Sequence, residues 1–201
     1  SVNPSTGNLT TTTRFFLKVT DAKGCTDTTS ILIQVNPKLI ASVSATKYIC
    51  YNTSTSLDAS ASSGGATPYT YSWSSNPSGF TSTLVNPSSG NITVATRFFV
   101  TVSDAKSCTD TTSVLVQVNP SISAKMGSDK FICYGASTII KGKGSGGSGS
   151  FTYSWSPTAS LATPSNDSTS ANPTTTTVYT LTVKDAKGCT ASGNVTVTVN
   201  P

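Results

Sequence analysis

The chain repeats itself with a period close to 82 residues. The segment Arg97–Cys108 has near copies at Arg14–Cys25 and Val178–Cys189. Other landmarks keep the same step, with offsets of 83, 82, 83 and 81: Cys50 recurs at Cys133, Trp73 at Trp155, and Asn36-Pro37 at Asn119-Pro120 and Asn200-Pro201. A repeat must be a folding unit or part of one, and this period is longer than those of solenoids and propellers. It therefore predicts a tandem array of small domains.

The period divides the chain into three pieces. We expect residues 1–37 to be the last part of a truncated repeat, and residues 38–120 and 121–201 to be complete repeats. Half a sandwich cannot bury its inner face alone. We therefore expect the missing strands to come from upstream in the same chain, with strand donation by another molecule as the alternative.

Each complete repeat is predicted to be a small β-sandwich. Stretches with period-two apolar residues alternate with Ser, Gly, Asn and Pro clusters. In the middle repeat they predict seven strands: 38–46, 53–60, 69–75, 80–85, 90–94, 96–103 and 110–118. Trp73 lies on the third of these, where an immunoglobulin-like sandwich carries a core tryptophan. We predict an all-β fold of tandem immunoglobulin-like (PKD-like) β-sandwich domains arranged end to end, with Trp73 and Trp155 in their cores.

The last two strands of each repeat form a predicted hairpin. In the middle copy the inward residues are Phe98, Val100 and Val102 on one strand and Val114, Val116 and Val118 on the other. A three-residue turn with a left-handed third residue joins such strands, and Gly24 and Gly188 suit that position. Ser107 occupies it in the middle copy, so we expect slight strain or a different turn there. Asp21, Asp104 and Asp185 head the turns, where an Asp side chain accepts local N–H groups.

The outer face of this hairpin differs between the copies. The first copy carries Phe16 and Leu32 and the second carries Phe99 and Leu115, whereas the third has Thr180 and Thr196. The register sets each Phe diagonal to its Leu. Two interpretations stay open: local packing within the hairpin, or contact with a neighbouring chain, domain or glycan.

The five cysteines occupy two kinds of position. Cys50 and Cys133 follow the start of a complete repeat, and Cys25, Cys108 and Cys189 close the hairpin turns. We favour pairing within a repeat, Cys50 with Cys108 and Cys133 with Cys189, which leaves Cys25 to a partner outside the chain. Bonds between consecutive repeats, such as Cys25–Cys50 and Cys108–Cys133, are the competing scheme. Either scheme requires an oxidising compartment.

The composition argues against catalysis and against several ligand classes. His and Glu are absent, so the chain lacks the usual general bases, most catalytic triads and the common metal-ligand sets. The net charge of +5 comes from scattered Lys and Arg, without the basic patch that nucleic acids need. The sequence has no stretch of 18 apolar residues, so we do not expect membrane insertion. We expect no enzyme activity, cofactor or metal. The Gly-rich stretch 141–150 does not match a phosphate loop and is predicted to be a flexible loop.

Several strings in the sequence resemble a known group of repeats. They are YTYSWSSNPSG, FTYSWSPTASL, the DAKGCT turns and the VNP ends, and they are similar to the Ig-like, PKD-like repeats of Bacteroidota cell-surface proteins, in the style of the SprB-type gliding-motility adhesins. This resemblance implies secretion, display on the bacterial cell surface and a stalk or adhesin role. It also implies O-glycosylation at Asp-Ser/Thr motifs, which this chain carries at Thr28, Thr111 and Ser168.

The sequence thus favours a structural function. We expect a non-catalytic repeat region of a bacterial surface adhesin or extracellular filament, acting as a stiff stalk. Its expected partners are further repeats of the same chain or neighbouring filament subunits, together with covalent glycans. The alternative is an adhesive module that binds glycans or another surface.

Overall fold

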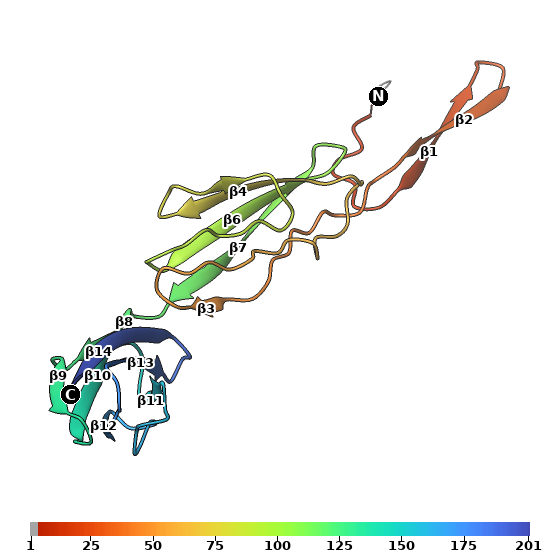
Figure 1. Cartoon of the computed structure of the whole chain (residues 1–201). Helices are drawn as coiled ribbons and strands as arrows, with labels where there is room; N and C mark the ends of the chain where they lie inside the picture. Colours follow the sequence, from red (N-terminus) through yellow and green to blue (C-terminus); the bar gives the residue numbers. More distant parts are fainter. Residues whose placement is uncertain (1–3) are drawn as a thin grey trace. The chain divides into compact units, whose positions relative to one another are not determined.

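The computed structural model describes residues 4–201, and all of their regular secondary structure is β (Figure 1). Residues 1–3, the start of the predicted truncated repeat, lie outside the described residues. Within residues 4–201, no helix has the length and apolar character needed to span a membrane. The contacts divide the chain into two compact units. The first contains Ser1–Ala45, Ser56–Ser88 and Arg97–Leu115, and the second contains Thr46–Thr55, Ser89–Thr96 and Val116–Pro201.

The C-terminal part of the second unit is a sandwich of two sheets. One sheet has the order β12-β10-β8 and the other the order β11-β13-β14-β9. Their bounds are β8 (Ile122–Met126), β9 (Lys130–Cys133), β10 (Thr138–Gly146), β11 (Phe151–Ser156), β12 (Ser168–Ala171), β13 (Thr177–Asp185) and β14 (Thr190–Asn200). All pairings are antiparallel except that of β9 with β14. Sequential strands divided between two sheets in this order form an immunoglobulin-like sandwich, as predicted.

Trp155 lies at the centre of this sandwich. It is almost completely buried on β11, opposite Leu181 of β13, and its indole Nε1 donates a hydrogen bond to the Asn166 carbonyl at 2.8 Å. Tyr179 is equally buried, and its hydroxyl shares a hydrogen bond with the Ser160 hydroxyl. The indole ring of Trp155 therefore fills the core while its only polar atom, Nε1, has a hydrogen-bond partner.

The prediction of a flexible loop at residues 141–150 is wrong for most of that stretch. Residues up to Gly146 belong to β10, with the lysines exposed and Gly142 and Gly144 buried. An added Cβ at Gly142 would lie 2.3 Å from Leu181 Cδ2, and one at Gly144 would lie 2.7 Å from Val183 Cγ1. The alternation of Lys and Gly is therefore a strand pattern with period two, in which glycine makes room for the opposite sheet.

A five-stranded sheet has the order β3-β7-β6-β4-β5. Its strands are β3 (Lys47–Ile49), β4 (Thr70–Asn76), β5 (Thr81–Ser82), β6 (Thr96–Ser103) and β7 (Thr109–Val118). Trp73 of β4 is buried opposite Val100, and its Nε1 donates to the Leu84 carbonyl at 2.8 Å. The predictions of a core Trp73 and of strands near 69–75, 96–103 and 110–118 are confirmed.

The other strand predictions in this repeat need correction. The segments 38–46, 53–60 and 90–94 make isolated bridges rather than strands, only Thr81–Ser82 of 80–85 is a strand, and β3 was not expected. Side chains replace part of the missing backbone ladder. The Asp110 carboxylate accepts the Ala41 N–H at 2.8 Å, and the Ser62 hydroxyl accepts the Ser42 N–H at 3.2 Å. These side-chain acceptors, which are distant in the sequence, take the place of regular sheet pairing.

The hairpin β1 (Thr13–Thr20) with β2 (Thr26–Ile33) is a two-stranded sheet in the first unit. Its turn has the predicted geometry, with Gly24 at φ 85°. Gly188 at φ 84° and Ser107 at φ 63° hold the same position in the other two turns. Ser107 therefore keeps the shared turn in a left-handed conformation that costs a non-glycine residue some strain.

Replacement of Trp155 by Ala should lower the free energy of unfolding by ~3–5 kcal/mol, because a buried indole and its hydrogen bond are both lost. Phe131→Ala is the matched control, since that ring is 74% exposed and its loss should change stability by less than about 0.5 kcal/mol. Urea denaturation of the two variants measures both effects. Equal losses would show that Trp155 does not hold the core together.

Candidate functional site

The first candidate site is the inner face of the β1–β2 hairpin. The register opposes Phe15 to Ile31 and Leu17 to Thr29, so these side chains share one face of the two-stranded sheet. Phe15, Ile31 and Leu17 occupy the positions of Phe98, Val114 and Val100 in the next repeat, at an offset of 83 residues. This face is therefore the counterpart of a sandwich core.

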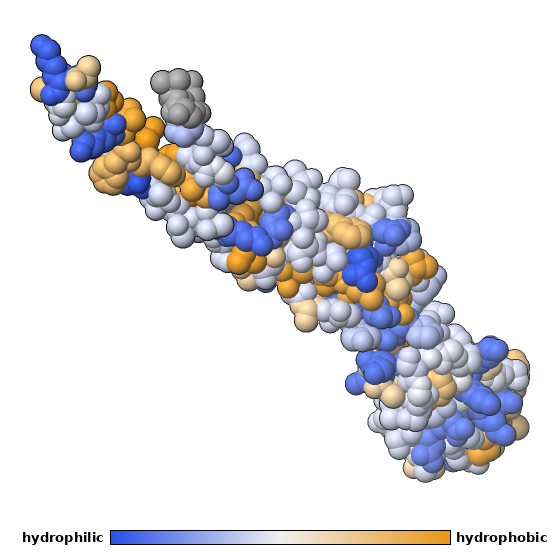
Figure 2. All heavy atoms as spheres, turned by 180° about the vertical axis from the view of Figure 1, so that it is seen from behind, coloured by the Kyte–Doolittle hydropathy of each residue, from blue (hydrophilic) through white to orange (hydrophobic). Residues whose placement is uncertain are grey.

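The two copies of this face differ sharply in exposure. Leu17 is 59% and Ile31 is 64% exposed, whereas Val100 and Val114 are buried. Apolar residues accordingly gather on the surface of the hairpin, which lies at the upper left in Figure 2. A contiguous apolar surface on two strands marks a place where a partner belongs.

The edges of the hairpin indicate what kind of partner fits. In the next repeat, β4 pairs antiparallel with residues 97–103, and β3 pairs parallel with residues 116–118. At the outer edges of the hairpin, the equivalent residues 14–20 and 33–35 pair with no further strand among the residues that the structure describes. The site therefore offers two open backbone edges beside an apolar face, which is the surface that two further strands would complete.

The predicted contact residues lie on the opposite face of the hairpins. Phe16 is 71% exposed and Leu32 is also exposed, while Phe99 and Leu115 are half-buried. Phe16 pairs with Ser30 and Arg14 with Leu32, which sets Phe16 diagonal to Leu32 as the sequence predicted. A contact of these side chains with a partner stays a prediction.

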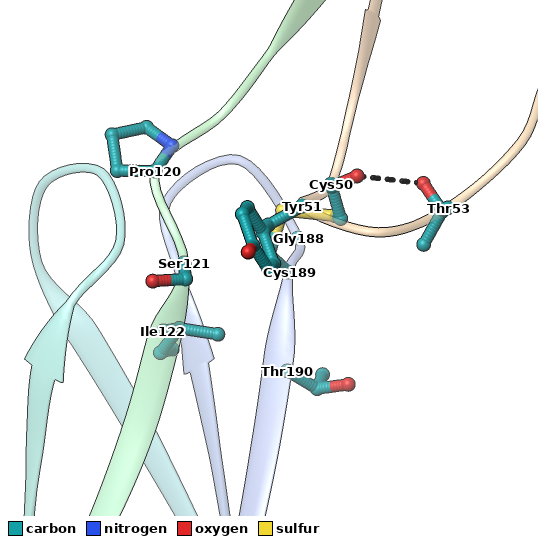
Figure 3. A pocket seen from close by; sticks show the side chains of 9 residues that line it. All are labelled: Cys50, Tyr51, Thr53, Pro120, Ser121, Ile122, Gly188, Cys189 and Thr190. Atoms are coloured by element: carbon teal, nitrogen blue, oxygen red, sulfur yellow. Dashed lines mark hydrogen bonds between the residues drawn. A yellow bond between two sulfur atoms is a disulfide. The ribbon is translucent and has the colours of Figure 1, made fainter. Parts of the chain in front are cut away.

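The second candidate site is the disulfide between Cys50 and Cys189, which are separated by 139 residues in the sequence (Figure 3). Both cysteines belong to the second compact unit. Pairing within a repeat was expected, and for these two cysteines that expectation is wrong. The bond instead joins the start of one predicted repeat to the hairpin turn of the next.

The surroundings of this disulfide come from three segments. A pocket of about 240 Å³ beside it is lined by Tyr51, Pro120 and Ile122, together with both cysteines and neighbouring turn residues. The side-chain amide of Asn119 lies 3.8 Å from Cys189 Sγ. Cys189 is only 2% exposed. Cys25, Cys108 and Cys133 are exposed free thiols in the structure.

The Asp at the head of each hairpin turn holds the cysteine in place. Asp185 Oδ1 accepts the N–H groups of Lys187 and Cys189, both at 2.9 Å, and Oδ2 accepts that of Ser148 at 2.9 Å. Burial raises the pKa of Asp185, but the N–H groups of Ser148, Cys189 and Lys187 outweigh it, and the pKa is lowered. The carboxylate therefore stays ionised and orders the turn.

Asp104 makes the same arrangement in the middle repeat. Its Oδ2 accepts the Ala66 N–H at 2.9 Å, and its Oδ1 accepts those of Lys106 and Cys108. The Ala66 N–H, followed by those of Cys108 and Lys106, lowers the pKa of Asp104 although burial opposes the shift. The prediction that these Asp side chains accept local N–H groups is confirmed. Within residues 4–201, no group of three His, Cys, Asp or Glu side chains could hold a metal ion.

Two pairs of exposed aromatic residues were missed in the sequence. Tyr48 and Tyr51 flank Cys50, and Phe131 and Tyr134 flank Cys133. Their common offset of 83 residues was the signal that could have revealed them. The predicted glycosylation residues Thr28 and Thr111 are exposed and Ser168 is half-buried. Glycans on these residues stay a prediction.

Comparison with known proteins gives matches among solved structures alone. No protein-family model and no curated protein matches the chain. The titin I-band fragment I67–I69 aligns with 13% identity and a TM-score of 0.43, covering 94% of this chain and 75% of its own. Drosophila OTK extracellular domains 3–5 align with 11% identity and a TM-score of 0.43, covering 94% and 72%. The insect immune protein hemolin aligns with 10% identity and a TM-score of 0.45, covering 93% and 56%. At these identities and TM-scores the matches carry no argument about this chain.

A charge on the open hairpin face should be tolerated where the same charge in the equivalent core is not. Leu17→Asp should change the free energy of unfolding of the 201-residue chain by less than about 0.5 kcal/mol. Val100→Asp should lower it by ~3–5 kcal/mol, because it buries an unpaired charge. Chemical denaturation compares the two variants.

The same pair of variants tests whether strands can complete the face. A chain with a copy of residues 38–95 placed before Thr13 should be destabilised by Leu17→Asp as strongly as by Val100→Asp. If Leu17→Asp remains neutral in that chain, the face does not accept the strands that cover its counterpart.

Proposed function

We propose that this chain is a non-catalytic, structural repeat region of a bacterial cell-surface adhesin or extracellular filament, and that it acts as a stiff stalk. The observation that carries the proposal is the open β1–β2 face. It repeats the buried face of the next repeat, and within residues 4–201 no further strand pairs with its outer edges. In an array of repeats, an open inner face of this kind is expected wherever the other strands of the same repeat are not paired with the hairpin.

The partner that fits the open face is the first part of another repeat. In both complete repeats the strand beside the hairpin carries a tryptophan opposite an inner-face residue: Trp73 faces Val100, and Trp155 faces Leu181. The equivalent place in the hairpin is opposite Leu17. We propose that a Trp-bearing strand from upstream in the same protein covers it. Donation of that strand by a neighbouring chain is the alternative source.

The connection between predicted repeats supports a stiff stalk. β7 ends at Val118 and β8 begins at Ile122, which leaves residues 119–121 as the link. The Asn119 N–H donates to the Ile49 carbonyl at 2.8 Å, which continues the β3–β7 pairing up to the link. The Cys50–Cys189 disulfide adds a covalent restraint in the same unit. A short link with a covalent restraint supports limited bending.

The proposed location is the exterior of a bacterial cell. A disulfide forms and persists in oxidising compartments, which include secreted and surface environments. The sequence resemblance to Bacteroidota surface repeats supports a bacterial surface in particular.

A second candidate function is that of an adhesive module that binds glycans. The exposed aromatic side chains of Tyr48, Phe131 and Tyr134 favour it, because sugars stack on exposed rings. A glycan array probed with the chain and with its Phe131→Ala variant examines this role. Binding that the substitution abolishes would favour adhesion over a purely structural role.

Covalent glycans on Thr28, Thr111 and Ser168 are part of the proposal. Peptides that contain these three residues, released by digestion of the protein isolated from its own host, should each show a mass above that of their sequence. Asp27→Asn, Asp110→Asn and Asp167→Asn should each abolish the added glycan mass at one site, because each substitution removes the acidic residue of one motif. A mass that matches the bare sequence would reject the modification.

The stalk role predicts how length grows with copy number. Chains with one and two added copies of residues 121–201 should lengthen by ~30–40 Å per copy, because each repeat advances by one strand of about 8 residues plus its loops. Small-angle scattering measures the maximum dimension of each chain. A much smaller increase per copy would contradict a stiff stalk.

A further inference from the structure

The cysteines at the start of each complete repeat have the same local structure. Cys50 directly follows β3, and Cys133 ends β9, the equivalent strand. The carbonyl of Cys50 accepts the Thr53 N–H at 3.2 Å, and that of Cys133 accepts the Ala136 N–H at 3.0 Å. Both turns contain a left-handed residue at the same place, Asn52 and Gly135. We call Cys50 and Cys133 the first-turn cysteines.

The three cysteines of the hairpin turns are likewise equivalent. In each turn the Asp N–H donates to the Cys carbonyl at 2.9 Å, and the Cys N–H donates to the Asp carboxylate at 2.8 or 2.9 Å. We call them the hairpin cysteines: Cys25, Cys108 and Cys189. Each hairpin therefore presents its thiol from the same backbone geometry, whether or not the thiol is bonded.

Burial follows bonding at these positions. The bonded hairpin cysteine, Cys189, is buried, whereas Cys25 and Cys108 are exposed. The bonded first-turn cysteine, Cys50, is half-buried, whereas Cys133 is exposed. Their aromatic neighbours follow the same trend, with Tyr51 48% and Tyr134 68% exposed. The free cysteines thus have the local structure of the bonded ones without the partner that covers them.

We propose that the Cys50–Cys189 bond is one rung of a repeating series, in which each first-turn cysteine bonds to the hairpin cysteine of the following repeat. Cys133 then takes the hairpin cysteine of a further repeat downstream. Cys108 and Cys25 take first-turn cysteines of repeats upstream. This inference rests on the proposed function, because it requires the array to extend beyond these residues.

Each rung forms by oxidation of two thiols. The two sulfur atoms lose two protons and two electrons as the S–S bond forms. The electrons reduce the disulfide of a thiol–disulfide oxidoreductase to its dithiol, which takes up the two protons. The exposed free thiols are accessible to such an oxidant.

The series would enclose the array in overlapping loops. One rung spans 139 residues, which exceeds the repeat period of about 82 residues. Successive loops therefore share residues, and every segment between the outermost rungs lies inside at least one loop. Closure of a loop of this length restricts the unfolded chain and opposes full extension of any single repeat.

The test compares the 201-residue chain with a chain that carries one added copy of residues 121–201 after Pro201. Both are oxidised by a thiol–disulfide oxidoreductase, alkylated, digested without reductant and mapped by mass spectrometry. The original chain should show Cys50–Cys189 and three alkylated thiols. The extended chain has two more cysteines and should show a second bond, from Cys133 to the added hairpin cysteine, while the number of alkylated thiols stays at three.

A matched control replaces the added hairpin cysteine by Ser. In that variant Cys133 should be alkylated and Cys50–Cys189 should persist. The series is rejected if Cys133 stays free in the extended chain, if it bonds to Cys108, or if the two added cysteines bond to each other. Scattering on the same chains separates this result from the stalk proposal. A chain that lengthens with each copy but leaves Cys133 free overturns the disulfide series alone.

Discussion

The pairing of the last hairpin with a tryptophan-bearing strand is the interaction on which each complete repeat depends. Trp73 and Trp155 lie opposite Val100 and Leu181 in the same sheet, and all four side chains are buried. At β1–β2, where residues 4–201 supply no such paired strand, Leu17 and Ile31 on the same face are exposed. A hairpin on its own buries little apolar area, so each repeat needs its opposing strands to form a core.

Polar groups at the ends of the sandwich hold its turns in place. Asp104 and Asp185 each accept three backbone N–H groups, two within the hairpin turn and one from the loop that precedes the tryptophan strand. The loop approaches closely because Gly65 and Gly147 have no side chain. A Cβ at these positions would lie 2.6 and 2.9 Å from the carboxylate oxygens. The same carboxylates position the hairpin cysteines, so the turn that orders the fold also presents the thiol.

Local patterns predicted the elements that depend on local geometry. The hairpin register, the Asp-headed turn and the buried tryptophans follow from period-two alternation and from turn residues, and all are confirmed. Predictions failed where a long-range contact decided the outcome. Residues 38–46 do not form a strand because Asp110 and Ser62 side chains take up backbone N–H groups. The Lys-Gly alternation of β10 has the composition of a loop, yet it is a strand because Gly142 and Gly144 face Leu181 and Val183.

The sequence by itself determined that this protein repeats one β-rich unit with the same hairpin in each copy, because the period, the alternation and the turn residues can all be recognised within contiguous segments. Only the tertiary structure decided which cysteines pair. The hairpin turns are alike in all three copies, so no local feature distinguishes Cys108 from Cys189 as the partner of Cys50. The choice depends on which turns the fold brings together, and 139 residues separate the two cysteines that bond. A disulfide forms only between sulfur atoms that the fold brings together, and the repeat period does not contain that information.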